Sequence, residues 1–138
     1  MPSKLPHEGV YVRLGLSAVH GIGVFAIRPI PAGTDIFAND CVPLVWVSKA
    51  QLGQARLTPA ERAFYHDFGI NRGDEIGCPA NFHNLTPGWY LNQPAPGETA
   101  NVLAGETLAF TAARDIAEGE ELTIDYPSFS DSPTDSPP

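Results

Sequence analysis

Turn-forming residues are dense along the whole chain, and they limit what it can fold into. The 138 residues include 13 glycines and 14 prolines, about a fifth of all positions. Proline removes a backbone donor and glycine is a poor helix former, so a bundle of long helices is disfavoured. Hydrophobic residues still make up 43% of the chain, which is enough for one buried core. The sequence therefore predicts a single, mainly β domain of short strands joined by many turns.

Alternating apolar residues mark the expected strands. From Val10 to Leu16 every second residue is apolar, which predicts a half-buried strand. Further extended segments are expected at 24–27, 36–37, 42–47, 108–113 and 122–126. One or two short helices accompany these strands in the predicted fold.

Helix-start signals lie in the middle of the chain. Thr58, Pro59 and Glu61 fit a capping box with proline in the first turn. We expect this helix to run to about Asp67 and to end before Gly69. The segment 48–51 has a similar form but is followed closely by a glycine, so it predicts a single turn.

The two ends of the chain differ from its middle. Residues 1–9 predict a loose N-terminal leader, residues 10–129 the folded domain, and residues 130–138 a disordered tail of Ser, Pro and Asp. No apolar run is long enough for a transmembrane helix, and no secretory signal is visible. The two cysteines do not make a disulfide framework. A cytoplasmic protein is therefore expected.

The formal net charge of −8 constrains the partners. A nucleic-acid-binding domain would present a basic stripe, so direct binding to nucleic acid is not expected, nor is association with a membrane. The field of an acidic chain instead favours a basic protein or peptide. The four histidines lack metal-ligand spacing and no Ser-His-Asp order is visible, so we expect no metal.

Two segments share one pattern. Residues 28–36 and 114–122 both have the form RxIxxGxx[IL], and each follows a short strand that begins with phenylalanine. Any two hairpins can share a glycine and an isoleucine. Four matched positions at fixed spacing nevertheless predict a duplicated hairpin with a tight turn at the glycine.

Three motifs offer candidate site residues, and each has an ordinary structural interpretation beside it. The loop at 20–25 has a GxG pattern that allows a close backbone approach but lacks the form of a dinucleotide site, so it could simply be a turn. The run 89–94 stops at Asn92 and Gln93, as a turn after a strand would. The run 119–126 ends in Tyr126, whose hydroxyl needs a partner that a ligand or the core can supply.

These motifs occur in the order found in one protein family. Residues 17–37 resemble the opening glycine-loop hairpin of SET domains, the fold of S-adenosylmethionine-dependent protein lysine methyltransferases. Residues 90–93 and 100–102 resemble the family's Asn-His-Ser…Pro-Asn segment, and residues 110–126 its closing GEELTxDY segment. The resemblance spans roughly residues 10–129. It implies a β-clip fold of short curved sheets, with the closing segment threaded through a loop as a C-terminal pseudoknot.

The resemblance also implies a cofactor site for S-adenosylmethionine. The residues that would contact its methionine part are Gly21, Ile22, Gly23 and Val24. Asn92 and Gln93 would hold its amino group and its adenine, and Phe129 would lie against the adenine ring. Tyr126 would contact the cofactor and act as the catalytic tyrosine, and Thr111 would line the channel for the substrate lysine.

Two departures from the family pattern leave an alternative open. Gln93 and Pro94 stand where the family has His and Ser, and the cysteine cluster that often follows the closing motif is absent. Another part of the chain, or the second subunit of a homodimer, would then complete the lysine channel. We expect a lysine N-methyltransferase that acts on a protein or peptide, with a basic, histone-like tail as one candidate. The alternative is a catalytically inactive SET-like binding or interaction module.

Four acidic residues gather at the closing motif. They are Glu118, Glu120, Glu121 and Asp125. An acidic rim beside a lysine channel would favour peptides with additional Lys or Arg around the target lysine. The same acids could equally form the solvated face of a strand.

Overall fold

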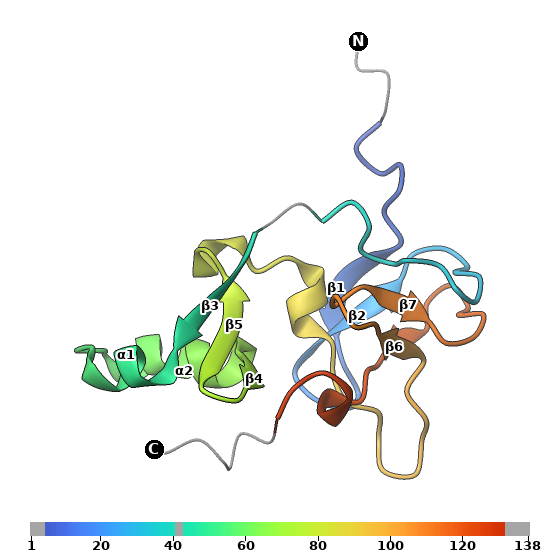
Figure 1. Ribbon diagram of the computed structural model, residues 1–138. Coiled ribbons are helices and arrows are strands. Elements are labelled where there is room, and N and C mark those ends of the chain that lie inside the picture. The colour runs from blue at the N-terminus through green and yellow to red at the C-terminus, as the bar shows by residue number, and fades with distance from the viewer. Residues whose placement is uncertain (1–4, 41–42, 132–138) are drawn as a thin grey trace.

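The computed structural model describes residues 5–40 and 43–131, and short strands dominate it (Figure 1). One antiparallel sheet has the order β1-β2-β8, with β1 at Val12–Leu16, β2 at Ile22–Ala26 and β8 at Glu121–Leu122. A second has the order β3-β5-β4, with β3 at Leu44–Ser48, β5 at Glu75–Pro79 and β4 at Ile70–Arg72. β6 (Val102–Ala104) pairs with β7 (Phe110–Ala112). The prediction of a mainly β domain is confirmed.

Short helices connect these strands. They are α1 (Lys49–Gln54), α2 (Pro59–Phe68) and the 3₁₀ turns η1 (Phe82–Asn84), η2 (Pro87–Tyr90) and η3 (Tyr126–Ser128). The capping box at Thr58 and Glu61 is present, and α2 ends at Phe68, before Gly69, as predicted. α1 has six residues rather than a single turn, with the Ser48 hydroxyl capping its first turn.

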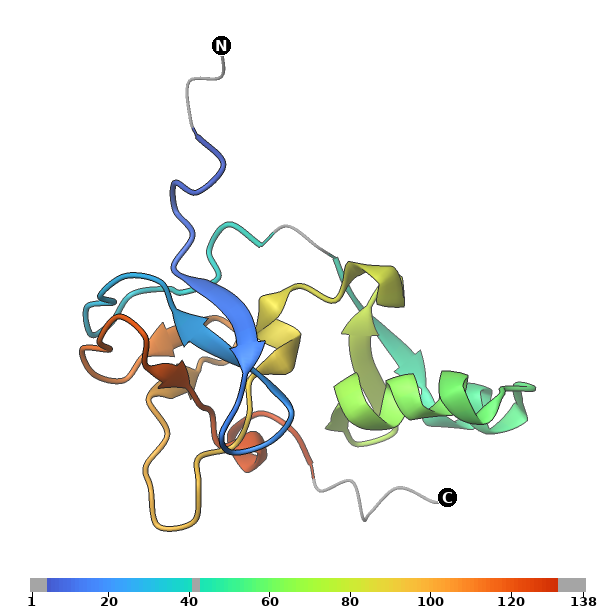
Figure 2. The same cartoon turned by 180° about the vertical axis from the view of Figure 1, so that it is seen from behind.

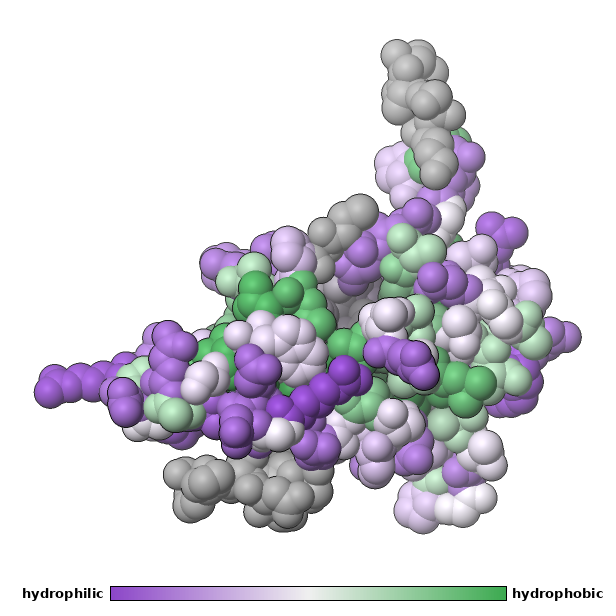
Figure 3. Space-filling view, viewed as in Figure 1, coloured by the Kyte–Doolittle hydropathy of each residue, from purple (hydrophilic) through white to green (hydrophobic). Residues whose placement is uncertain are grey.

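The chain forms two lobes (Figures 1 and 2). The sheet β3-β5-β4 with α1, α2 and η1 forms one lobe, which we call the insert because it separates β2 from η2 along the chain. The other two sheets form the main lobe and hold the hydrophobic core. Figure 3 shows apolar residues on the near face of the insert, amid a mostly polar surface.

The repeated pattern pairs with its own copy across the core. Ile30 and Ile116, both almost fully buried, exchange two backbone hydrogen bonds of 2.8 Å. The turn glycine of each copy has a positive φ, +85° at Gly33 and +86° at Gly119. The Gly33 N–H donates to the carbonyl of Ala112, two residues before the second copy, and the Gly119 N–H donates to the carbonyl of Ala26, two residues before the first. The two copies are therefore interlocked, whereas the sequence predicted two separate hairpins.

The closing segment is held on both sides. The Ile124 N–H donates to the Asn92 carbonyl (2.9 Å), and the Val102 N–H donates to the Thr123 carbonyl (3.0 Å). Leu122 and Ile124 are fully buried between these partners. This is the predicted C-terminal pseudoknot, and it brings residues 91–92 and 121–126 together.

Three sequence expectations for the main lobe were wrong. The segment 36–37, expected to be extended, forms a turn. Along β1 only Val12 is buried and Leu16 is 89% exposed, because the strand extends beyond the core. The apolar run before Asn92 forms the 3₁₀ turn η2 rather than a strand.

The chain beyond Phe129 contacts the insert before it leaves the described residues. The Asn71 N–H donates to the Ser130 hydroxyl, and the Asp131 N–H donates to the Asn71 carbonyl. The Asp131 carboxylate accepts from the Gly73 N–H at 2.8 Å. The rest of the expected tail, residues 132–138, lies outside the described residues, as do the first four residues of the expected leader.

Candidate active site

Asn92 joins the glycine loop to the pseudoknot. Its amide nitrogen donates to the carbonyls of His20 (2.9 Å) and Ile22 (3.2 Å), and to the Glu121 carboxylate (3.1 Å). The Asn92 side chain is buried, so these bonds are shielded from water. Two motifs that lie 70 residues apart in the sequence thus meet at one place.

Tyr126 reaches the same place from the other side. Its hydroxyl donates to the Leu91 carbonyl at 2.7 Å, one residue before Asn92. Tyr126 is 39% exposed, and the burial of its remaining surface raises the pKa of its phenol above the ordinary value. The phenol is therefore protonated at neutral pH, and it acts as a hydrogen-bond donor rather than as a base.

The predicted residues of the glycine loop differ in exposure. Gly21 is exposed, has a φ of +48° and has open space where a side chain would be. Ile22 is 49% exposed, whereas Val24 is fully buried in the core opposite Leu122. Gly21 and Ile22 are thus accessible to a ligand, and the Val24 side chain serves packing.

An aromatic ring, that of Phe129, packs against Tyr126. Phe129 contacts Tyr126 edge-on with ring centroids 6.1 Å apart, and it contacts Phe110 at 5.4 Å. Side chains alternate along a strand, so Thr111 faces the opposite side of β7 from Phe110. The structure does not bring Thr111 to this cluster, and its role in the channel stays a prediction. Gln93 is exposed next to Asn92.

Two polar residues of the site were missed by sequence reasoning. The Ser17 hydroxyl donates to the Glu121 carboxylate at 2.9 Å and accepts from the N–H groups of Val19 and His20. No sequence motif pairs Ser17 with Glu121, which lies 104 residues away. Glu121 was assigned only to the acidic rim.

The neighbouring Glu120 has different partners. Arg114 forms an ion pair with it and, as the largest cause, lowers the pKa of the Glu120 carboxyl from 4.5 to about 2. Asn101 donates to the Glu120 carboxylate and to the Glu121 carbonyl, and accepts from the Thr123 N–H at 2.8 Å. Glu120 therefore belongs to the pseudoknot's framework rather than to the glycine loop.

The three segments that meet here contain no Lys or Arg. Residues 15–27, 89–113 and 115–131 carry only acidic and neutral side chains, apart from His20, and Arg72 of the insert reaches them only at the Phe129 carbonyl among the described hydrogen bonds. The groups that line the convergence are backbone carbonyls, hydroxyls, an amide and the Glu121 carboxylate. This chemistry suits a cationic ligand and does not suit a phosphate-rich one.

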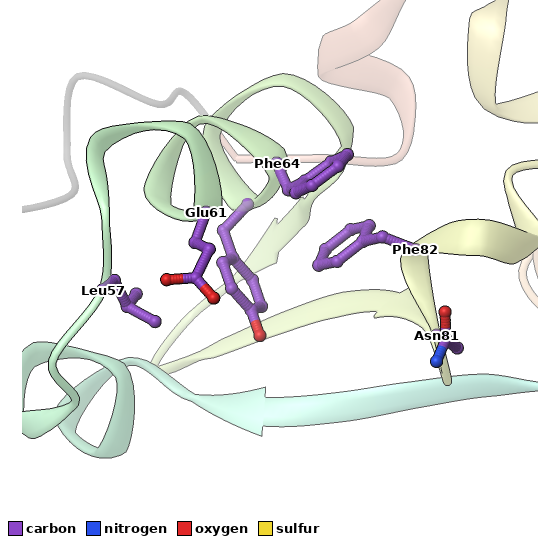
Figure 4. A pocket seen from close by; sticks show the side chains of 6 residues that line it. Leu57, Glu61, Phe64, Asn81 and Phe82 are labelled. Atoms are coloured by element: carbon purple, nitrogen blue, oxygen red, sulfur yellow. The ribbon is translucent and has the colours of Figure 1, made fainter.

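A separate hollow of about 310 Å³ lies in the insert (Figure 4). Its lining residues are Leu57, Glu61, Phe64, Tyr65, Asn81 and Phe82. Phe82 stacks on Phe64 with ring centroids 4.7 Å apart. None of the predicted site residues lines this hollow.

Neither a metal site nor a membrane-spanning helix is present in the described part of the chain. Within residues 5–40 and 43–131, no group of three or more His, Cys, Asp or Glu side chains is placed to hold a metal ion. No helix in that part of the chain is long and apolar enough to cross a membrane.

The knotted closing segment, the glycine loop and the buried asparagine define a SET-type β-clip domain. The SET domain family model matches residues 21–127, so the chain belongs to the SET domain family. No curated protein matches the sequence significantly.

Solved structures share this fold at low sequence identity. The methyltransferase domain of human PR domain-containing protein 2 is 24% identical, with a TM-score of 0.52, and the match covers 86% of this chain and 76% of that one. A Chaetomium thermophilum Polycomb Repressive Complex 2, autoinhibited and bound to S-adenosylmethionine, is 22% identical with a TM-score of 0.56. That match covers 91% of this chain but only 16% of the other. A histone methyltransferase candidate of Plasmodium falciparum is 16% identical with a TM-score of 0.50, covering 83% and 90%.

Proposed function

We propose that the protein is an S-adenosylmethionine-dependent protein lysine N-methyltransferase. The observation that carries the proposal is the meeting of Gly21, Asn92 and Tyr126 around one pseudoknot. Membership of the SET domain family supports it, since that family contains enzymes of this class.

The residues present fit the cofactor. S-adenosylmethionine carries a sulfonium and an ammonium group, and the surrounding segments offer carbonyl oxygens and a carboxylate without a competing Lys or Arg. The exposed backbone around Gly21 and Ile22 would receive the methionine part, and Asn92 would hold the loop in that shape. Phe129 would offer a ring face for the adenine. Gln93 would contribute its backbone, which its replacement of the family's His leaves intact.

The bound cofactor would supply a methyl group on a positively charged sulfur. The acceptor must be a neutral amine, although lysine in water has a pKa of about 10.4. A site that excludes water and adjoins a positive charge disfavours the ammonium form, so a bound lysine can lose its proton.

The Tyr126 hydroxyl and nearby carbonyls such as that of Leu91 would orient the amine in line with the methyl group. The protein's contribution is therefore alignment and electrostatics. A protonated Tyr126 fits this role because its oxygen can accept while its hydrogen donates.

The substrate proposal is a lysine in a basic protein or peptide. The acidic net charge supports it, and so do the exposed Glu118 and Asp125 at the closing segment. Glu120 and Glu121 already have partners inside the protein, so the proposed rim rests on fewer acids than the sequence suggested. The proposal includes no nucleic-acid or membrane partner, places the protein in the cytoplasm and leaves a homodimer open.

A cofactor titration tests the proposal against an inactive binding module. Calorimetry with folded wild-type protein should detect binding of S-adenosylmethionine, and Asn92→Ala should weaken it. An exposed Asn84→Ala variant should match the wild type. Absence of binding at millimolar cofactor would favour the inactive module, since that function needs no cofactor.

A further inference from the structure

Two adjacent glutamates of the closing segment point to different partners. Side chains alternate along an extended segment, so Glu120 and Glu121 leave on opposite sides. Glu120 reaches Arg114, its ion-pair partner. Glu121 reaches the glycine loop, where its partners are the hydroxyl of Ser17 and the amide of Asn92. The two residues therefore do different things despite their identical chemistry.

Ser17 links Glu121 to the loop backbone. The Ser17 hydroxyl oxygen lies 2.9 Å from each of the two Glu121 carboxylate oxygens, and its one hydrogen points toward the carboxylate. Its oxygen in turn accepts from the N–H of Val19 (2.9 Å) and of His20 (3.1 Å). The Ser17 N–H closes the loop by donating to the Gly21 carbonyl at 2.8 Å. The loop conformation thus depends on Ser17, and Ser17 is oriented by Glu121.

Asn92 forms the second connection. Its amide nitrogen has two hydrogens but three acceptors, which are the carbonyls of His20 and Ile22 and the Glu121 carboxylate. The charged oxygen is the strongest acceptor of the three and fixes the orientation of the amide. The Glu121 carboxylate therefore contacts the loop directly through Ser17 and indirectly through Asn92.

Gly23 makes room for this carboxylate. A Cβ atom at position 23 would lie 2.3 Å from a Glu121 carboxylate oxygen, so no larger residue fits without moving Glu121. The second glycine of the GxG pattern is thus explained by the Glu121 side chain. Gly21, with open space around it, is the glycine that remains accessible to a ligand.

We propose that Glu121 is a positioning residue that holds the loop at 17–22, through Ser17 and Asn92, in the shape that receives the cofactor. Among the described residues Arg114 pairs with Glu120 rather than with Glu121, so the Glu121 carboxylate is held by neutral donors. The effect on the loop exists without any ligand, whereas the effect on cofactor binding rests on the proposed function.

The test compares Glu121→Gln and Ser17→Ala with Glu98→Gln. The control removes the same charge from an exposed residue outside the proposed acidic rim. Hydrogen exchange at the Val19 and His20 amides should speed up about tenfold in both loop variants and stay unchanged in the control. Exchange in the core strand β7 should not change in any variant. The affinity for S-adenosylmethionine should fall about tenfold in both loop variants.

The pair of variants also separates positioning from general stability. If Glu121 acts through Ser17, the double variant should lose little more affinity than either single variant. The KM for S-adenosylmethionine should rise more than the KM for a peptide substrate. Unchanged exchange at Val19 and His20 in both variants overturns the inference. If exchange at these amides is faster in both variants but the wild-type protein binds no S-adenosylmethionine, the loop role is supported and the proposed function is rejected.

Discussion

Replacing Asn101 with alanine should destabilise the pseudoknot more than any ordinary surface change. Asn101 is only 2% exposed, accepts from the Thr123 N–H at 2.8 Å and donates to the Glu121 carbonyl at 2.9 Å. Alanine removes these two bonds and the bond to the Glu120 carboxylate, and it leaves two polar backbone groups without these partners inside the knot. Leaving such a buried group unsatisfied costs about 1–3 kcal/mol, so we expect a loss of about 3 kcal/mol. For a domain of this size that corresponds to a fall in Tm of about 12 °C.

Urea unfolding measures this loss. The midpoint for Asn101→Ala should move to lower urea with an unchanged m-value, because the variant alters stability rather than the area exposed. The matched control is Asn84→Ala, since Asn84 is exposed at the end of η1 and its change should stay within about 0.5 kcal/mol. A loss below about 1 kcal/mol for Asn101→Ala would refute the view that its amide locks the threaded segment.

Three further predictions concern the catalytic tyrosine, the ion pair and the chain end. Tyr126→Phe should cut turnover by well over tenfold, a barrier change above about 1.4 kcal/mol, with little change in cofactor affinity; wild-type turnover would make the tyrosine a packing residue. The lowered pKa of Glu120 means that its pairing with Arg114 stabilises the fold fully above about pH 4.5 and is lost as the pH falls to about 2. Arg114→Leu should remove that part of the acid dependence, and urea midpoints measured across this pH range decide the matter. Removal of 132–138 should leave the Tm unchanged, whereas removal of 130–138 should lower it, because Ser130 and Asp131 bind the β4–β5 hairpin. Equal Tm values for the two truncations would contradict this.

Local chemistry made some elements predictable from sequence. The capping box at Thr58 and Glu61 is completed within one helical turn, and α2 formed as predicted. Alternation along a strand is also local, and it puts Leu122, Ile124 and Tyr126 on one face. Leu122 and Ile124 are fully buried, whereas Tyr126 begins the turn η3 and is 39% exposed. The order of three motifs, rather than any single one, predicted the pseudoknot.

Two strands of the insert sheet, β4 and β5, were missed because they lack an apolar pattern, whereas β3 overlaps the segment expected at 42–47. β4 and β5 join through the turn Gly73–Asp74, and their sequences mix polar residues, glycine and proline. Their stability comes from pairing with β3 and from the Ser130 and Asp131 bonds, which are contacts distant in sequence. Gly73 in the turn has a positive φ, and a glycine is the kind of residue that favours such a turn.

The candidate site was predictable only in part, for a related reason. The motifs identified Asn92 and Tyr126, but not their hydrogen-bond acceptors, which are the backbone carbonyls of His20 and Leu91. The motifs also did not pair the Ser17 hydroxyl with Glu121. Backbone acceptors depend on how the chain is threaded, and a strand pattern does not reveal that.

Transfer of a labelled methyl group tests the central claim most directly. The protein would be incubated with methyl-labelled S-adenosylmethionine and a basic peptide that contains one lysine, next to the same peptide with arginine in its place. The account predicts label on the lysine of the first peptide, none on the second, and strongly reduced transfer by Tyr126→Phe. A protein that binds S-adenosylmethionine yet labels no lysine, across basic and neutral peptides and basic protein substrates, would contradict the enzymatic account and leave a binding module.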